Sequence, residues 1–89
     1  MPDRPEAQTP LSVPVRIDDE NISIRGHATE EYIRMLARLV DQKIQEVRRN
    51  QPNLPRHRAA ILAALNIADE LERVKQENAE LLEVLEEAR

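Results

Sequence analysis

Residues whose types and spacing could carry chemistry are few in this sequence. The two histidines, His27 and His57, have no second ligand at the spacing of a metal site, so we expect surface or helix-end positions for both. No recognisable motif places a base beside Ser12 or Ser23. Gly26 is the single glycine, which excludes the glycine-rich loops that cradle phosphates. The sequence therefore predicts no catalytic, metal or cofactor site, and a protein that is not an enzyme.

The composition limits the core and indicates a compartment. Tyr32 is the one Phe, Tyr or Trp residue in 89 residues, and 34% of the chain is charged, so a small aliphatic core is expected. The absence of cysteine excludes disulfides and thiolate metal sites. No apolar run approaches the roughly 18 residues of a membrane span, and no signal peptide is evident. We expect a cytoplasmic protein without membrane insertion that gains burial by oligomerising.

Charge is distributed unevenly along the chain. The net charge is −4, with three basic and eight acidic residues in 59–89 but eight basic and four acidic residues in 25–58. The basic bias of the middle segment favours an acidic partner and is too weak to indicate nucleic-acid binding. A basic leucine zipper needs a continuous basic helix before its coiled coil, whereas residues 59–68 carry no charge. No nucleic-acid partner is therefore expected.

The N-terminal part of the chain predicts a tail followed by a β-hairpin. Residues 1–12 contain three prolines and little apolar surface, which is typical of a disordered tail. Apolar and polar residues then alternate along 13–18 and 22–25, which predicts two short strands joined by a polar turn at 19–21. The apolar face of this hairpin consists of Val15, Ile17, Ile22 and Ile24. Because a lone hairpin is marginal in water, we expect a helix to cover this face.

A helix is predicted directly after the hairpin. Thr29 precedes two glutamates, the pattern of a capping hydroxyl with acids in the first helical turn. Helical spacing continues to Arg48 and Arg49, cations that suit a helix C-terminus. The apolar positions of this helix are Ile33, Leu36, Ala37, Val40, Ile44 and Val47. We expect residues 13–54 to form a small head from the hairpin and this helix.

A second, longer helix is predicted over residues 55–89. The connection at 50–55 contains two prolines, and Pro55 is expected at the first helical position. At about 1.5 Å per residue this helix is on the order of 50 Å long. Its first part, residues 59–68, is apolar on nearly all faces, which predicts burial all round. The large residues expected between the first helix, the hairpin and a partner subunit are Ile61, Leu62, Leu65 and Ile67.

The rest of the second helix carries the seam of a coiled coil. Residues at alternating steps of four and three are Ile67, Leu71, Val74, Asn78, Leu81, Leu85 and Ala88. Such a heptad pattern requires a second helix to bury it. Asn78 at an a position favours a parallel, in-register dimer, and Glu70 at g with Lys75 at e agrees with that arrangement. The alternative interpretation is that Asn78 is a tolerated polar residue near a frayed helix end.

Two residues beside the seam favour a larger assembly. Leu82 and Val84 occupy e and g positions and widen the apolar edge over the last turns. This widening suits a bundle of more than two helices. We therefore predict a homodimer whose distal helices can pair with those of a second dimer, giving a homotetramer.

Three segments in this order resemble the ZapA family of bacterial cell-division proteins. They are Ile-Ser-Ile-Arg-Gly at 22–26, Ala-Arg-Leu-Val-Asp-Gln-Lys-Ile at 37–44, and Arg-Ala-Ala-Ile-Leu-Ala-Ala-Leu-Asn-Ile-Ala-Asp-Glu-Leu at 58–71. The resemblance covers roughly residues 13–89, and Pro55 departs from it where the family tends to have Asp. The predicted hairpin and helices give an α+β fold with a coiled-coil tail, and the resemblance implies a cytoplasmic dimer that often assembles into tetramers through the coiled coils. It also implies binding to filaments of the tubulin-like GTPase FtsZ, whose protofilaments are bundled at the division septum.

Arginines of the predicted head are the candidates for contacting FtsZ. They are Arg16, Arg25, Arg34, Arg38 and Arg48. Each could equally be an ordinary solvated surface residue. The alternative function is that of a small coiled-coil adaptor or assembly factor for another cytoplasmic partner.

Overall fold

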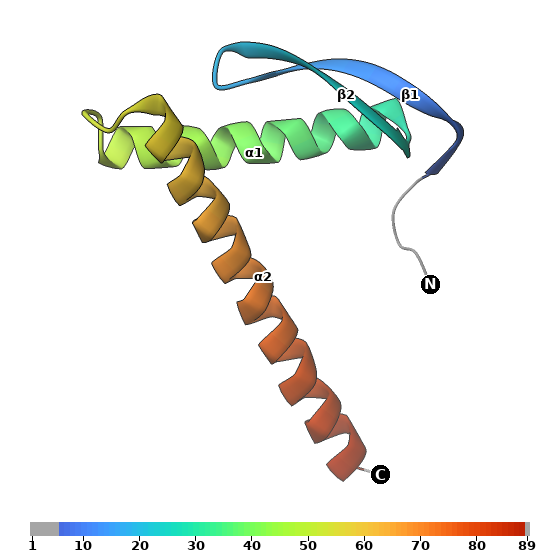
Figure 1. The fold of residues 1–89 in the computed structure, drawn as a ribbon. Coiled ribbons are helices and arrows are strands. Elements are labelled where there is room, and N and C mark those ends of the chain that lie inside the picture. The colour runs from blue at the N-terminus through green and yellow to red at the C-terminus, as the bar shows by residue number, and fades with distance from the viewer. Residues whose placement is uncertain (1–5, 89) are drawn as a thin grey trace.

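The computed structural model describes residues 6–88, with side chains from Ser12 onward. The elements, in chain order, are β1 (Glu6–Ile17), β2 (Glu20–Ala28), α1 (Glu30–Asn50) and α2 (Arg56–Glu87). The two strands form an antiparallel hairpin that lies along α1, and α2 leaves the C-terminal end of α1 as a long rod (Figure 1). The predicted α+β fold, with a hairpin, a first helix and a longer second helix, is confirmed.

The hairpin turn is tighter than the sequence suggests. Asp18 and Asp19 both adopt positive φ angles, 50° and 64°, and Ile17 pairs directly with Glu20. A two-residue turn with both central residues left-handed matches the twist of the flanking strands, and Asp tolerates that conformation better than most residues. The predicted turn at 19–21 is therefore wrong, and β2 begins at Glu20.

The first strand also begins earlier than predicted. β1 includes residues 6–12, which the sequence assigns to a disordered tail, so that assignment is wrong for this segment; residues 1–5 lie outside the described residues. The reason is that β2 continues to Ala28 and offers its backbone to the preceding chain. Leu11 pairs with Gly26 and Glu6 with Ala28, with an irregularity between the two pairs. Pro10 lies in that irregularity, where its missing N–H costs no regular ladder bond.

The N-terminus of α1 is fixed by the predicted cap. The backbone N–H of Tyr32 donates to Oγ1 of Thr29 at 3.3 Å, so one of the unpaired donors of the first turn is satisfied. Acidic residues in the first turn and basic residues in the last turn complement the helix dipole. The start of α2 differs by one position, because Pro55 is the N-cap and Arg56 is the first helical residue.

Two clusters of buried residues hold the elements together. The first joins the hairpin to α1 and consists of Val13, Val15, Ile33 and Ala37. The second joins α1 to the start of α2 and consists of Ile44, Val47, Ala59 and Ala63. The two alanines are 0% and 1% exposed, which lets α2 approach α1 closely. We call the hairpin, α1 and residues 56–68 of α2 the head, and residues 69–88 the stalk.

The burial of the hairpin and of α1 differs from the predicted faces at two points. Ile22, predicted on the buried face of the hairpin, remains 40% exposed. Val13, which is not among the four predicted residues of that face, is buried. Leu36 of α1 is 42% exposed within this chain. The cause at the hairpin is that β1 packs on α1 while β2 lies farther out.

Candidate self-association and partner-binding surfaces

An apolar stripe runs along the stalk without any covering contact from the described part of the chain. Its large members, Leu71, Val74, Leu81 and Leu85, are between 52% and 58% exposed. Asn78 and Ala88 of the predicted seam are also exposed, and Ile67 at its start is half-buried. Exposed apolar surface of this extent on a small protein marks an interaction site. The stripe is thus available for a second helix.

The flanks of the stripe are equally exposed. Leu82 is 60% and Val84 is 59% exposed, so both of the residues proposed for pairing of dimers are accessible. No buried residue lies in α2 beyond Ala63 among the described residues. The stalk therefore contributes nothing to the core of its own head.

The start of α2 has two apolar sides. Ala59 and Ala63 face α1, whereas Ile61 and Leu65 are 48% and 60% exposed. Leu62 is half-buried and packs against the second cluster. Burial of Ile61 and Leu65 is thus absent within the described protomer, and the predicted contact with a partner subunit remains a prediction for these two residues.

A shallow apolar groove lies between the hairpin and α1. Its lining residues are Ile17, Ile24, Ile33, Leu36, Ala37 and Val40. Leu39 extends this apolar area along α1 and is 49% exposed. The head therefore presents apolar surface on both helices, in addition to the stripe on the stalk.

The charged pair expected across the dimer is used within the chain. Glu70 accepts a hydrogen bond from Nζ of Lys43 in α1, and Lys75 pairs with Glu72 at 3.4 Å along α2. The hydrogen bond with Glu70 is the main reason that the pKa of Lys43 is raised above its ordinary value. The contact ties α2 to α1 at Glu70, about two helical turns beyond Ala63 of the second buried cluster. The side chains of Glu70 and Lys75 are both more than half exposed, so the pairing of Glu70 with Lys75 across a parallel dimer stays a prediction.

The candidate arginines fall into three environments. Arg16, Arg34 and Arg38 line one shallow hollow beside Val15 and Ala37, so the structure brings these three together.

Their contacts leave much of the basic surface open. Arg16 pairs with Asp19 at 3.5 Å, and the side chains of both are about 70% exposed. Arg34 pairs with Glu30 at 3.1 Å, and its Nη1 also donates to the carbonyl oxygen of Pro14. Exposed pairs of this kind are weak, so a partner could replace them at small cost.

The remaining two arginines lie apart from this hollow. Arg25 is exposed on β2. Nη1 of Arg48 contacts both carboxylate oxygens of Asp18, at 3.0 and 3.2 Å. The side chain of Arg48 is 37% exposed, so only part of it can reach a partner.

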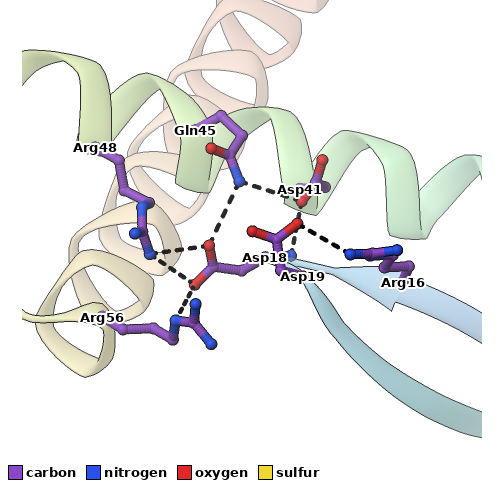
Figure 2. A network of polar contacts seen from close by, with 7 residues as sticks. All are labelled: Arg16, Asp18, Asp19, Asp41, Gln45, Arg48 and Arg56. Carbon is purple, nitrogen blue, oxygen red and sulfur yellow. Dashed lines mark hydrogen bonds and ion pairs between the residues drawn. The ribbon is translucent and has the colours of Figure 1, made fainter.

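Asp18 is the centre of a polar network that the sequence analysis missed (Figure 2). Its carboxylate is also 3.4 Å from Nε of Arg56 in α2 and accepts from Gln45 of α1 at 3.4 Å. Its backbone N–H donates to Oδ1 of Asp41 at 2.7 Å. Asp18 is 4% exposed, and a buried carboxylate is tolerated only when it is paired in this way. The network therefore links the turn of the hairpin to the C-terminal part of α1 and to the first residue of α2.

A signal for this network exists in the sequence but is ambiguous. Asp18 continues the polar positions of the first predicted strand, and an acidic turn residue is normally solvated. Its partner Arg48 lies 30 residues away along the chain. Only the packing of the hairpin on α1 shows that the two meet.

A hairpin and helix that carry a second helix with an exposed apolar stripe define a small head-and-stalk protein. In the described part of the chain, neither helix is long and apolar enough to cross a membrane.

Comparison with known proteins identifies the family. The family model described as "Cell division protein ZapA" matches residues 13–89 of this chain. The proteins of that name from Bacillus anthracis and Geobacillus sp. (strain WCH70) are 33% identical over 69 residues and 32% identical over 78 residues. These alignments cover 78% of both chains in the first case, and 88% of this chain and 90% of the relative in the second. The chain therefore belongs to the ZapA family of cell division proteins, as the resemblance in the sequence predicts.

A solved structure agrees with this assignment. "ZapA mutant dimer from Geobacillus stearothermophilus" matches with a TM-score of 0.67 and 34% sequence identity, over 97% of this chain and 95% of that chain. The likeness therefore extends over the head and the stalk.

Proposed function

We propose that this protein is a non-enzymatic crosslinker of FtsZ filaments. It binds FtsZ in the cytoplasm at the division septum and bundles protofilaments as a homodimer or homotetramer. The proposal is supported by membership of the ZapA family and by the similarity to the ZapA mutant dimer from Geobacillus stearothermophilus. The observation that carries it is the apolar stripe on the stalk, from Leu71 to Leu85, which has no partner among the described residues of the chain.

The stalk is the proposed self-association element. Two stripes that pack together would bury Leu71, Val74, Leu81 and Leu85 of both copies, with Asn78 facing its equivalent. Leu82 and Val84 would then join the stalks of two dimers. The stalk part of α2, from Asp69 to Glu87, spans about 28 Å at ~1.5 Å per residue, so heads at the two ends of a tetramer would be separated by roughly the length of a stalk. This separation allows one assembly to contact two filaments at once.

The basic hollow is the proposed FtsZ-binding surface. Arg16, Arg34 and Arg38 present their charge beside the hairpin. Arg25 and the exposed part of Arg48 are further candidates that lie apart from this hollow. A single contact of this kind is weak, because exposed charges are screened by salt. When one head of an assembly is bound, the other heads bind at a high effective concentration, so several weak contacts together hold the filaments.

Filament co-sedimentation tests the proposal. A double variant with Arg34→Ala and Arg38→Ala is expected to weaken binding to FtsZ polymers at least tenfold and to abolish bundling. The matched control, Arg49→Ala with Arg73→Ala, removes the same charge from exposed positions outside the hollow and should pellet like the wild type. Equal pelleting of both double variants would assign the contact to another surface. Failure of the wild type to pellet with FtsZ would instead favour an adaptor for a different partner.

A further inference from the structure

The two outer edges of the hairpin differ in their capacity to accept another strand. Pro14, in the middle of β1, has no N–H to donate. Its carbonyl oxygen accepts a hydrogen bond from Nη1 of Arg34 at 3.1 Å, so that oxygen points away from β2. A missing donor and an occupied acceptor are devices that protect edge strands from further pairing. The outer edge of β1 is therefore blocked at its centre.

The same contact fixes the direction of the backbone groups in β2. Pro14 is the direct partner of Ser23, and in an antiparallel ladder two direct partners point their N–H and C=O groups either toward each other or both outward. Since Pro14 points outward, so does Ser23, and so do Asn21 and Arg25 two residues to either side. Among the described residues, no hydrogen bond outside the hairpin ladder reaches these backbone groups. The outer edge of β2 is open.

The surroundings of the open edge define what could bind there. On the side facing α1, Ile22 is 40% exposed and Ile24 lines the apolar groove. On the opposite face, Ser23 and Arg25 are exposed. Because side chains alternate between the faces of a sheet, an added strand would place every second residue against the isoleucines and the others beside Arg25.

We propose that the outer edge of β2 is a docking site for an extended segment of a partner protein in which apolar and acidic residues alternate. Backbone hydrogen bonds to Asn21, Ser23 and Arg25 would hold the segment, as in other cases of strand addition. Its apolar side chains would cover Ile22 and Ile24, and its carboxylates would pair with Arg25. This site is separate from the stalk stripe and from the arginine hollow, and it does not depend on the partner being FtsZ.

Amide hydrogen exchange of the full-length, assembled protein tests whether the edge is open. The amides of Ile22 and Ile24 point toward β1, so we expect the amides of Ser23 and Arg25 to exchange at least tenfold faster than these two. Equal protection of the amides of Ser23 and Ile24 would mean that a second copy already covers the edge. That result would overturn the proposal.

Peptide titration followed by NMR tests the chemistry of the segment. The probe is a blocked ten-residue peptide that alternates Glu and Val, and its control alternates Lys and Val. The Glu peptide is expected to shift the amides of residues 21–25 and to bind at least tenfold more tightly than the Lys peptide. Equal binding of the two peptides, or no binding of the Glu peptide at millimolar concentration, contradicts the proposal.

Two proline variants locate the bound strand. Ser23→Pro removes one outward N–H of β2 but no bond of the hairpin ladder, and it should weaken binding of the Glu peptide at least tenfold. Ser12→Pro is the matched control, because it also removes the hydroxyl contact between Ser12 and Ser23 but alters the β1 edge. Circular dichroism establishes that both variants are folded. Unchanged binding by a folded Ser23→Pro variant would place the peptide elsewhere.

Discussion

The head and the stalk of this protein bury their apolar residues in different ways. In the head, both buried clusters and the Asp18 network lie within one chain. In the stalk, every described residue is exposed, including the four large residues of the stripe. Most helical stability in proteins comes from packing of an apolar face, and the stalk has no such packing within the described chain. The comparison shows that the head packs within its own chain, whereas the stalk stripe would be covered only through the proposed self-association.

The largest expected effect is dissociation of the assembly by a substitution in the stalk. Leu81→Asp would place a carboxylate in the proposed seam of both copies, which costs on the order of 5 kcal/mol per dimer when the charges are unpaired. We expect the assembly to dissociate, with a lower mass by light scattering at micromolar concentration. Glu83→Asp, on the exposed part of the helix, is the control and should keep the wild-type mass. An unchanged mass for Leu81→Asp would refute the proposed seam.

The next largest effect is a loss of stability in the head when the Asp18 network is weakened. Asp18→Asn keeps a side chain that tolerates positive φ but removes the charge shared by Arg48 and Arg56. We expect a loss of about 1–3 kcal/mol in the free energy of unfolding, at the lower end if the half-exposed guanidinium groups are rehydrated. Asp19→Asn makes the same chemical change in the same turn at an exposed residue, and it should cost less than about 0.5 kcal/mol. Equal losses in urea unfolding would show that the turn, rather than the network, matters.

A third change sharpens the comparison by strengthening the stalk. Asn78→Leu replaces an amide in the proposed seam by an apolar side chain, so we expect a higher melting temperature and a shift in assembly state. Gln76→Leu makes a similar change off the stripe and should alter neither property appreciably. Destabilisation by Asn78→Leu would mean that Asn78 does not lie in a buried seam.

The smallest effect concerns the contact between the two regions. Glu70→Gln weakens the pair with Lys43, and we expect only a slight shift of the urea midpoint. Because this pair raises the pKa of Lys43, its contribution is fully present below the ordinary lysine pKa and is lost as the pH rises through the raised value. The difference between wild type and variant should therefore stay constant from pH 7 to about 9 and shrink only at higher pH. A difference that disappears already near pH 8 would show that Lys43 is not its source.

Local patterns were sufficient to predict most of the fold. The alternation of apolar residues predicted the hairpin, and Thr29 predicted the start of α1, because both depend on neighbours in the sequence. The prolines of residues 1–12 obscured the early start of β1, since pairing with β2 depends on a distant strand. The turn was misplaced because Asp18 and Asp19 adopt positive φ without a glycine to signal it.

The candidate sites were predicted less completely, for a related reason. The sequence placed the seam residues on one side of a helix, since seven-residue spacing is itself local. It did not show that Arg16, Arg34 and Arg38 meet around one hollow, or that Arg48 is held by Asp18. These contacts join the hairpin to α1, and their geometry follows from tertiary packing.

Sedimentation equilibrium of the wild-type protein over a wide concentration range tests the central claim most directly. If the stalk stripe is covered by another copy of the chain, the mass will correspond to a dimer or a tetramer at micromolar concentration. A folded monomer that persists at the highest concentrations, with α2 fully helical, would contradict this account.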